Sequence, residues 1–270
     1  MTFTDKLRAA QAATRSRVCV GLDPDPARLP RSLRDLPPAD AVLAFNRAII
    51  DATADIACAF KPNLAFYEAL GADGWHVFAE TVAMIPDGRL VIADAKRGDI
   101  GNTARMYARA FFEGVDADAV TVSPYMGSDA ITPFLETEGR CAFVLVATSN
   151  PSGPELQALV ADGEPVYRRT ARLAVEAAAE RPGEAGFVVG ATRPELLAEI
   201  RAAHPDVPFL VPGVGAQGGD AAAVVAAAGS GPLLVNSSRG ILYASDGDDF
   251  AAAARRATES LREALGDPNR

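Results

Sequence analysis

Short runs of apolar residues recur along the chain and are separated by longer segments with a different pattern. Each run holds three to five residues, mostly Val, Leu, Ile, Phe and Ala. Continuous apolar runs are typical of strands that are buried on both faces, as in a parallel sheet. Eight strands are therefore predicted, at Val18–Leu22, Ala57–Phe60, Leu90–Ala93, Ala119–Val122, Phe143–Ala147, Phe187–Gly190, Phe209–Val211 and Leu233–Val235.

The segments between these runs have the periodicity of amphipathic helices. In Ala39–Ala57, for example, Val42 and Phe45 fall on the same side of a helix as later apolar residues. Val166–Glu180 and Phe250–Leu265 are rich in Ala and Arg, which favour helix. Strands and helices thus alternate along the chain.

Eight strands alternating with helices predict an α/β fold, namely a closed (β/α)8 TIM barrel. The 270 residues suit one such domain, which typically needs about 250 residues. We therefore expect residues 1–270 to form a single domain, with a short amphipathic helix within Met1–Arg17. A doubly wound open sheet is the alternative, but no Gly-x-Gly-x-x-Gly follows the first strand.

Composition excludes several classes of function. The net charge of −9 argues against binding to nucleic acid or to a membrane surface, because both require a basic face. No apolar run approaches the roughly 18 residues needed to span a bilayer, and the N-terminus lacks the apolar centre of a secretion signal. Three widely spaced cysteines, Cys19, Cys58 and Cys141, indicate small core residues in a reducing cytoplasm. Neither His76 nor His204 has neighbours at metal-ligand spacing.

The basic residues are unevenly divided, with 23 arginines and only three lysines. Lysine is a compact charge that can pass a proton, whereas arginine stays protonated. Lys6 has no evident role, but Lys61 and Lys96 each stand where a predicted strand ends. The C-terminal ends of barrel strands form the active site, so both lysines are expected there with Asp23 and Asp94.

The last two predicted strands are followed by loops with the composition of a phosphate site. One is the glycine-rich segment Pro212–Gly219, and the other is Asn236–Gly240, which contains Arg239. Small residues expose backbone N–H groups, and a guanidinium can bind phosphate through two hydrogen bonds. Barrel enzymes often bind phosphate at these two loops, so a phosphorylated substrate is predicted.

Several segments in the correct order resemble one known family. Asp94-x-Lys96-x-x-Asp99 resembles the signature of the orotidine 5′-phosphate decarboxylase superfamily, and the longer string Asp94–Thr103 resembles the longer bacterial branch of the decarboxylases. One departure is Ser238 before Arg239, where shorter members usually carry glycine. Further matching segments are Gly21–Pro24, Phe60–Asn63, Thr148–Pro151, Pro212–Gly219 and Asn236–Arg239.

The resemblance implies decarboxylation of orotidine 5′-phosphate to UMP, with neither an organic cofactor nor a metal. It implies that Lys96 lies beside C6, stabilises the developing carbanion and donates the proton that replaces CO2. Asp94 would lie near the departing carboxylate, and Lys61 would pair with Asp94 and contact the ribose. Asp99 and Thr103 would reach the site of a neighbouring subunit, which makes the implied enzyme a homodimer.

The resemblance also implies a set of substrate-binding residues. Asp23 would bind a ribose hydroxyl, Ser149 the pyrimidine amide, and Gln217 and Arg239 the phosphate. The full implied set is Asp23, Thr103, Ser149, Pro212, Gln217, Gly218 and Arg239. Two alternatives remain open: a Mg²⁺-dependent sugar-phosphate decarboxylase or aldol-type synthase of the same superfamily, and a non-catalytic barrel that only binds a phosphate ester.

Overall fold

A computed structural model describes residues 1–215 and 218–269. Eight parallel strands close into a barrel in the order β1-β10-β9-β8-β5-β4-β3-β2. All eight predicted strands are present, with boundaries that differ by a few residues, and the barrel fold is confirmed. The barrel strands are β1 (Val18–Leu22), β2 (Ala59–Pro62), β3 (Leu90–Arg97), β4 (Ala119–Val122), β5 (Cys141–Ala147), β8 (Glu184–Val189), β9 (Phe209–Pro212) and β10 (Leu233–Ser237).

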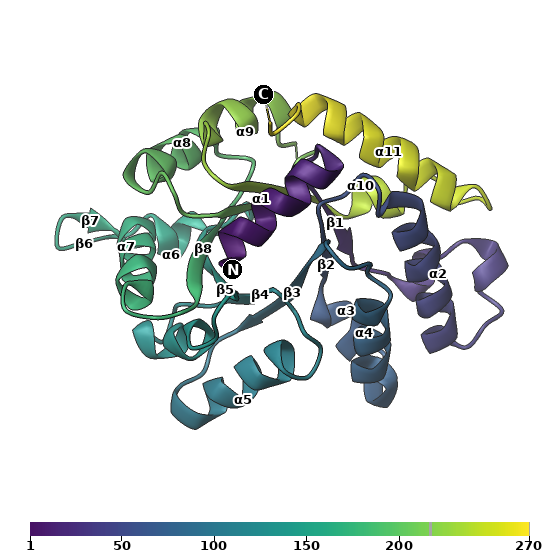
Figure 1. Ribbon diagram of the computed structural model, residues 1–270, viewed down its shortest axis with the longest axis horizontal. Coiled ribbons are helices and arrows are strands. Elements are labelled where there is room, and N and C mark those ends of the chain that lie inside the picture. Colours follow the sequence, from purple (N-terminus) through teal and green to yellow (C-terminus); the bar gives the residue numbers. More distant parts are fainter. Residues whose placement is uncertain (216–217, 270) are drawn as a thin grey trace.

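Helices surround the barrel, as Figure 1 shows. They cover the outer faces of the strands, whose residues are almost all buried as the continuous apolar runs predict. None of the described helices is long and apolar enough to cross a bilayer. The outer helices are α2 (Pro38–Thr53), α3 (Leu64–Glu68), α4 (Gly74–Ala83), α5 (Gly101–Phe112), α7 (Val166–Ala178), α8 (Pro194–Ala203), α9 (Ala221–Ala228), α10 (Arg239–Leu242) and α11 (Phe250–Leu265).

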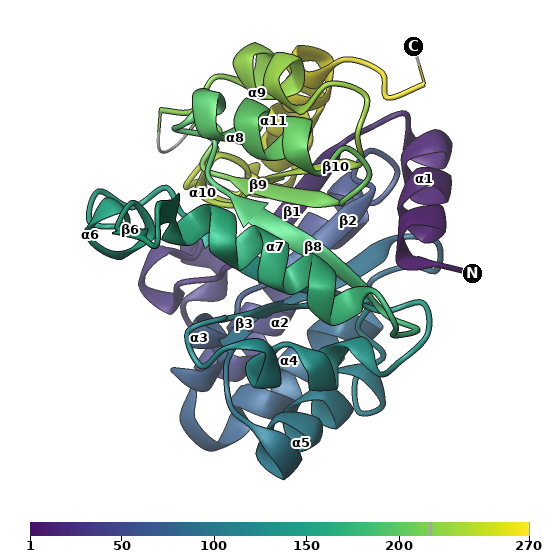
Figure 2. The same cartoon turned by 90° about the vertical axis from the view of Figure 1, so that its left-hand side faces the viewer.

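Two features of the connections were not predicted from the sequence. The loop after β5 contains the short helix α6 (Pro154–Gln157) and a small antiparallel hairpin of β6 (Val160–Ala161) and β7 (Glu164–Pro165). This hairpin projects from the side of the molecule opposite the N-terminal helix (Figure 2). Its strands have only two residues each, too few for the apolar pattern to reveal them.

The predicted N-terminal helix is present as α1 (Phe3–Thr14) and lies across one end of the barrel (Figures 1 and 2). It begins with a capping box, in which the Thr2 hydroxyl accepts the Asp5 N–H and the Asp5 carboxylate accepts the Thr2 N–H. Phe3 and Leu7 are fully buried in a cluster with barrel-strand residues, most of which lie in the N-terminal halves of their strands. The helix therefore closes the end of the barrel opposite the expected active site.

Packing and hydrogen bonds both fix the start of α1. The Phe3 ring meets the Phe143 ring of β5 edge to face, with centroids 5.6 Å apart. The next residue, Thr4, donates its backbone N–H and its hydroxyl to the two carboxylate oxygens of Glu184, at 3.1 and 2.5 Å. These contacts join the first helix to two neighbouring strands.

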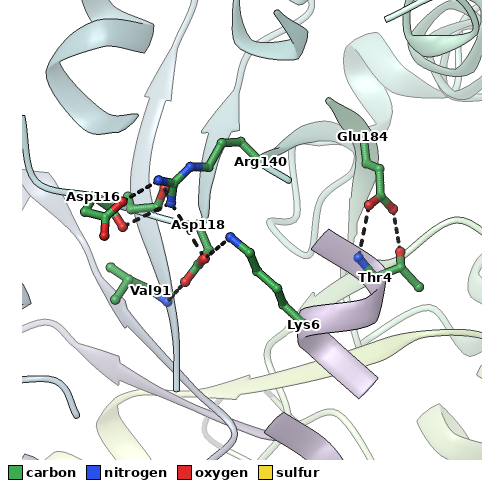
Figure 3. A network of polar contacts seen from close by, with 8 residues as sticks. Thr4, Lys6, Val91, Asp116, Asp118, Arg140 and Glu184 are labelled. Atoms are coloured by element: carbon green, nitrogen blue, oxygen red, sulfur yellow. Dashed lines mark hydrogen bonds and ion pairs between the residues drawn. The ribbon is translucent and has the colours of Figure 1, made fainter. Parts of the chain in front are cut away.

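A second polar contact involves Lys6, the lysine for which the sequence indicated no role (Figure 3). Its ammonium lies 2.9 Å from Asp118, whose other carboxylate oxygen accepts the Val91 N–H at 3.0 Å. Arg140 lies 3.7 Å from the same carboxylate and also pairs with Asp116. Lys6 therefore ties α1 to Asp118 directly before β4 and, through that carboxylate, to Val91 of β3, at the end of the barrel remote from Lys61 and Lys96.

We predict that Phe3→Ala lowers the free energy of unfolding by about 3 kcal/mol, because it leaves a cavity under α1. Phe3→Leu, which keeps most of the apolar volume, is the matched control and should lose less. Urea denaturation of the three proteins measures both values. A loss below about 1 kcal/mol for Phe3→Ala would show that α1 does not close this end of the core.

Candidate active site

A cavity of about 510 Å³ lies at the C-terminal ends of the barrel strands. This is the end at which the sequence predicted the active site. All eight barrel strands or the residues directly after them contribute to its lining, which includes Asp23, Lys61, Asp94, Lys96, Thr121, Leu145, Ser149, Val188, Leu210, Pro212, Asn236 and Arg239.

The Asp94 carboxylate lies at the centre of the charged cluster. Its Oδ2 accepts a hydrogen bond from Lys61 Nζ at 2.7 Å, and its Oδ1 accepts one from Lys96 Nζ at 2.6 Å. The side chains of Lys61 and Asp94 are only 4% and 9% exposed, whereas that of Lys96 is 51% exposed. One buried carboxylate therefore holds a buried ammonium on one side and an ammonium that faces the cavity on the other.

The pKa values of this buried pair shift in opposite directions. Burial alone would raise the pKa of Asp94, but the ammonium groups of Lys61 and Lys96 lower it well below its ordinary value. Burial alone would likewise lower the pKa of Lys61, but the Asp94 carboxylate and then Asp23 raise it above its ordinary value. Asp94 and Lys61 are therefore both charged across the neutral pH range.

The backbone of β3 is irregular where it carries this cluster. Lys96 has a φ of +46°, a left-handed conformation that is uncommon for a residue other than glycine. The pairing of β3 with β4 shifts register between Ala93 and Arg97. Within this irregular stretch the Lys96 side chain contacts Asp94, two residues earlier in the strand.

The loop after β9 has the backbone conformation expected of a glycine-rich turn. Gly213, Gly215 and Gly218 all have positive φ values, a region that other L-residues rarely adopt. Gly213 and Pro212 line the cavity, whereas Gly218 is exposed and does not. Gln217, to which the family resemblance gave a phosphate-binding role, lies outside the described residues.

Arg239 stands at the first position of α10, directly after β10. Its side chain lines the cavity and, among the described residues, has no ion-pair partner. Ser237 and Ser238 precede it along the same wall. The two loops that the sequence assigned to phosphate therefore meet at one side of the cavity.

Two polar oxygens in the cavity wall lack a partner within the described part of the chain. Asp23 Oδ1 and Asn236 Oδ1 are buried and accept no hydrogen bond there. Buried acceptors are almost always satisfied, so groups of this kind at a cavity wall are suited to bind a ligand hydroxyl or amide. Asp23 was predicted from the sequence, but Asn236 was given no role of its own.

Asp99 and Thr103 do not line this cavity, although they follow Lys96 closely in the sequence. The Asp99 carboxylate accepts the Ile100 N–H at 2.8 Å, just before the start of α5. Thr103 is exposed in the first turn of α5. The chain therefore does not bring these two residues to its own Asp94 and Lys96.

Sequence reasoning missed residues from the proline-rich loop after β1. Arg28 of this loop lines the cavity, with its guanidinium 3.8 Å from the centroid of the Tyr243 ring. The Tyr243 hydroxyl accepts the Asp25 N–H at 2.7 Å and donates to the carbonyl of Asp23 at 3.2 Å. A loop arginine has no periodic signal, so its place could not be read from the sequence.

Metal-ligating side chains are not clustered in this cavity. Within residues 1–215 and 218–269, no group of three or more His, Cys, Asp or Glu side chains has an arrangement suited to a metal ion. The three cysteines are all buried, and burial raises the pKa of Cys19 to about 12. They are core residues, as their spacing predicted.

A closed barrel whose lysine–carboxylate cluster lines a cavity at the C-terminal ends of the strands has the organisation of a (β/α)8-barrel enzyme. The chain belongs to the orotidine 5′-phosphate decarboxylase / HUMPS family, whose model matches residues 16–256. The resemblance found in the sequence is thus confirmed.

Individual relatives match almost the whole chain. The orotidine 5′-phosphate decarboxylase of Herpetosiphon aurantiacus is 49% identical and covers 98% of this chain and 100% of its own length. That of Roseiflexus castenholzii is 52% identical, covering 98% and 97%. The solved structure of Leishmania donovani OMP decarboxylase is 38% identical with a TM-score of 0.82, covering 98% and 99%. These matches favour an orotidine 5′-phosphate decarboxylase over the two alternatives considered above.

Proposed function

We propose that this protein decarboxylates orotidine 5′-phosphate to UMP, the last step of de novo pyrimidine nucleotide synthesis. The observation that carries the proposal is the Asp94 carboxylate, which binds both Lys61 and Lys96 within one cavity. Relatives about 50% identical over nearly the full chain are named for this activity. Lys61, Asp94 and Lys96 all come from one (β/α)8 barrel.

Lys96 is the proposed proton donor. Loss of CO2 breaks the bond to C6 and leaves its electron pair on that carbon, which has no adjacent electron sink. A fixed positive charge next to C6 stabilises this carbanion without the reorganisation that water would need. The Lys96 ammonium then transfers a proton to C6, and the neutral amine regains one from solvent. Arginine could not serve, because its guanidinium does not release a proton in proteins.

Asp94 and Lys61 hold Lys96 in place and interact with the substrate around C6. Asp94 provides negative charge near the departing carboxylate and fixes the Lys96 ammonium through its 2.6 Å hydrogen bond. Lys61 neutralises Asp94 from the buried side. We propose that Lys61 also contacts the ribose. Asp23, whose Oδ1 has no partner among the described residues, accepts a hydrogen bond from a ribose hydroxyl.

The remaining substrate-binding residues contact either the pyrimidine base or the phosphate of the nucleotide. Ser149 binds the pyrimidine amide, and Pro212 contributes to the wall beside it. Arg239 and Gln217 bind the phosphate, where a guanidinium can form two hydrogen bonds. The phosphate is remote from C6, so its binding energy can drive closure of the site around the reacting carbon.

A homodimer completes each active site in this proposal. Asp99 and Thr103 lie outside their own cavity and would serve the site of the partner subunit. Three apolar side chains in the segments after β3 and β4 are exposed: Ile100 is 49%, Met106 48% and Met126 48% exposed. Exposed apolar side chains of this kind are suited to an interface between subunits. We further propose that the dimer works in the cytoplasm, without a metal or an organic cofactor.

The first test follows the loss of orotidylate absorbance on addition of the purified protein. We expect turnover that is unchanged by EDTA. Lys96→Ala and Lys96→Arg should each lower kcat by at least about a thousandfold, because fixed charge and proton donation are both lost or misplaced. Lys6→Arg makes the same chemical change at the other end of the barrel and should retain full activity. A Lys96 variant with a tenth of the wild-type kcat would exclude the proposed role.

The second test addresses the shared site by mixing two inactive variants, Lys96→Ala and Asp99→Asn. In a hybrid dimer, one site carries both changes and the other carries neither. Random exchange of subunits makes half of the dimers hybrids, so about a quarter of the wild-type activity should return by the reciprocal geometry of a two-fold interface. Mixtures that exchange subunits but stay inactive would show that Asp99 acts within its own chain.

A further inference from the structure

Thr121 of β4 lies beneath the charged cluster and had no assigned role. Its side chain stands among apolar strand residues and is 1% exposed. The backbone N–H of Lys96 donates to Thr121 Oγ1 at 2.9 Å, and the Thr121 hydroxyl lies 2.9 Å from Asp94 Oδ1. One hydroxyl therefore contacts the backbone of the lysine and the side chain of the carboxylate at once.

The direction of these two hydrogen bonds is fixed by chemistry. An amide N–H can only donate, and an ionised carboxylate can only accept. The single hydrogen of the Thr121 hydroxyl must therefore point to Asp94, while its lone pair receives the Lys96 N–H. Neither bond can form through a methyl group, so valine, which has the same shape, cannot replace threonine in this role.

The irregularity in β3 explains why a side chain is needed at this position. Ala93 pairs with Val120 and Arg97 with Val122, so Thr121 alone lies opposite the three residues from Asp94 to Lys96. Such a bulge leaves backbone groups without partners in the ladder. The Lys96 N–H is one of these groups, and the Thr121 hydroxyl satisfies it while Lys96 holds its uncommon φ of +46°.

We propose that Thr121 is a positioning residue, which holds the β3 bulge in the conformation that directs the Lys96 ammonium and the Asp94 carboxylate toward one point in the cavity. Thr121 acts through these two residues and does not need to touch the substrate. The kinetic part of this inference rests on the proposed decarboxylation. The structural part concerns the bulge alone and can be measured separately.

The kinetic test compares Thr121→Val with Thr121→Ser. Valine removes both hydrogen bonds and should lower kcat for orotidine 5′-phosphate about tenfold to a hundredfold, the size of effect expected for a hydrogen bond to a charged group. KM should change less than about threefold, because the binding residues stay in place. Serine restores the hydroxyl and should keep kcat within about threefold of wild type.

A matched control is Thr53→Val in α2, where a fully buried threonine hydroxyl bonds, among the described residues, to the Ile49 carbonyl alone. This variant should leave kcat unchanged. Thr121→Ala, which also lacks the hydroxyl, takes the place of the valine variant if the latter fails to fold. A hydroxyl-free variant that keeps more than half of the wild-type kcat overturns the proposal, and so does a loss that serine does not rescue.

The structural test does not depend on activity. Hydrogen exchange of the Lys96 amide, followed by NMR, should be at least tenfold faster in Thr121→Val, while the Ile92 and Ala93 amides in regular pairing exchange as in wild type. An unchanged Lys96 amide overturns the proposed role of Thr121. If the wild-type protein does not turn over orotidine 5′-phosphate, the proposed function fails, and the exchange measurement still decides whether Thr121 holds the bulge.

Discussion

The structure of the cavity depends on one buried carboxylate and the two ammonium groups that neutralise it. Asp94 is largely removed from solvent, and a carboxylate in that environment is stable only if it is paired. Lys61 supplies a buried partner, and Lys96 supplies a partner that faces the cavity. Removing Asp94 would leave the buried Lys61 ammonium without its carboxylate, so the buried Lys61–Asp94 pair must be kept together. The electrostatic attraction between Asp94 and Lys96 therefore stabilises the carboxylate and also fixes the position of the Lys96 ammonium at the cavity.

The two ends of the barrel have different functions, and a lysine has a different role at each end. At the closed end, Lys6 pairs with Asp118 and fastens α1 across the core. At the open end, Lys96 is half exposed, and its contact with Asp94 leaves part of the ammonium free to meet a substrate. This division is typical of (β/α)8 barrels, in which one end serves stability and the other serves chemistry. Because one end of the barrel is rigid, the other end can hold Lys96 in its uncommon left-handed backbone conformation.

Much of the fold could be predicted because its signals are local. The strands are continuous apolar runs, and the C-terminal ends of parallel strands must meet, which is why Lys61, Asp94 and Lys96 could be placed together. Thr121 could not be recognised, because a threonine within an apolar run is indistinguishable from a core residue until the β3 bulge is seen. Arg28 was missed because loops carry no periodicity, and Gln217 lies outside the described residues.

Asp94 stays ionised because Lys61 and Lys96 flank it. Its pKa should therefore be lower than the ordinary value of 3.8. The most direct test is a ¹³C NMR titration of the Asp94 side-chain carboxyl in the folded protein, with Asp94→Asn used to assign the signal. The carboxyl signal should show no protonation shift between pH 8 and pH 4. A protonation shift within this range, which a carboxyl with the ordinary pKa of 3.8 would begin to show near pH 4, would contradict this explanation.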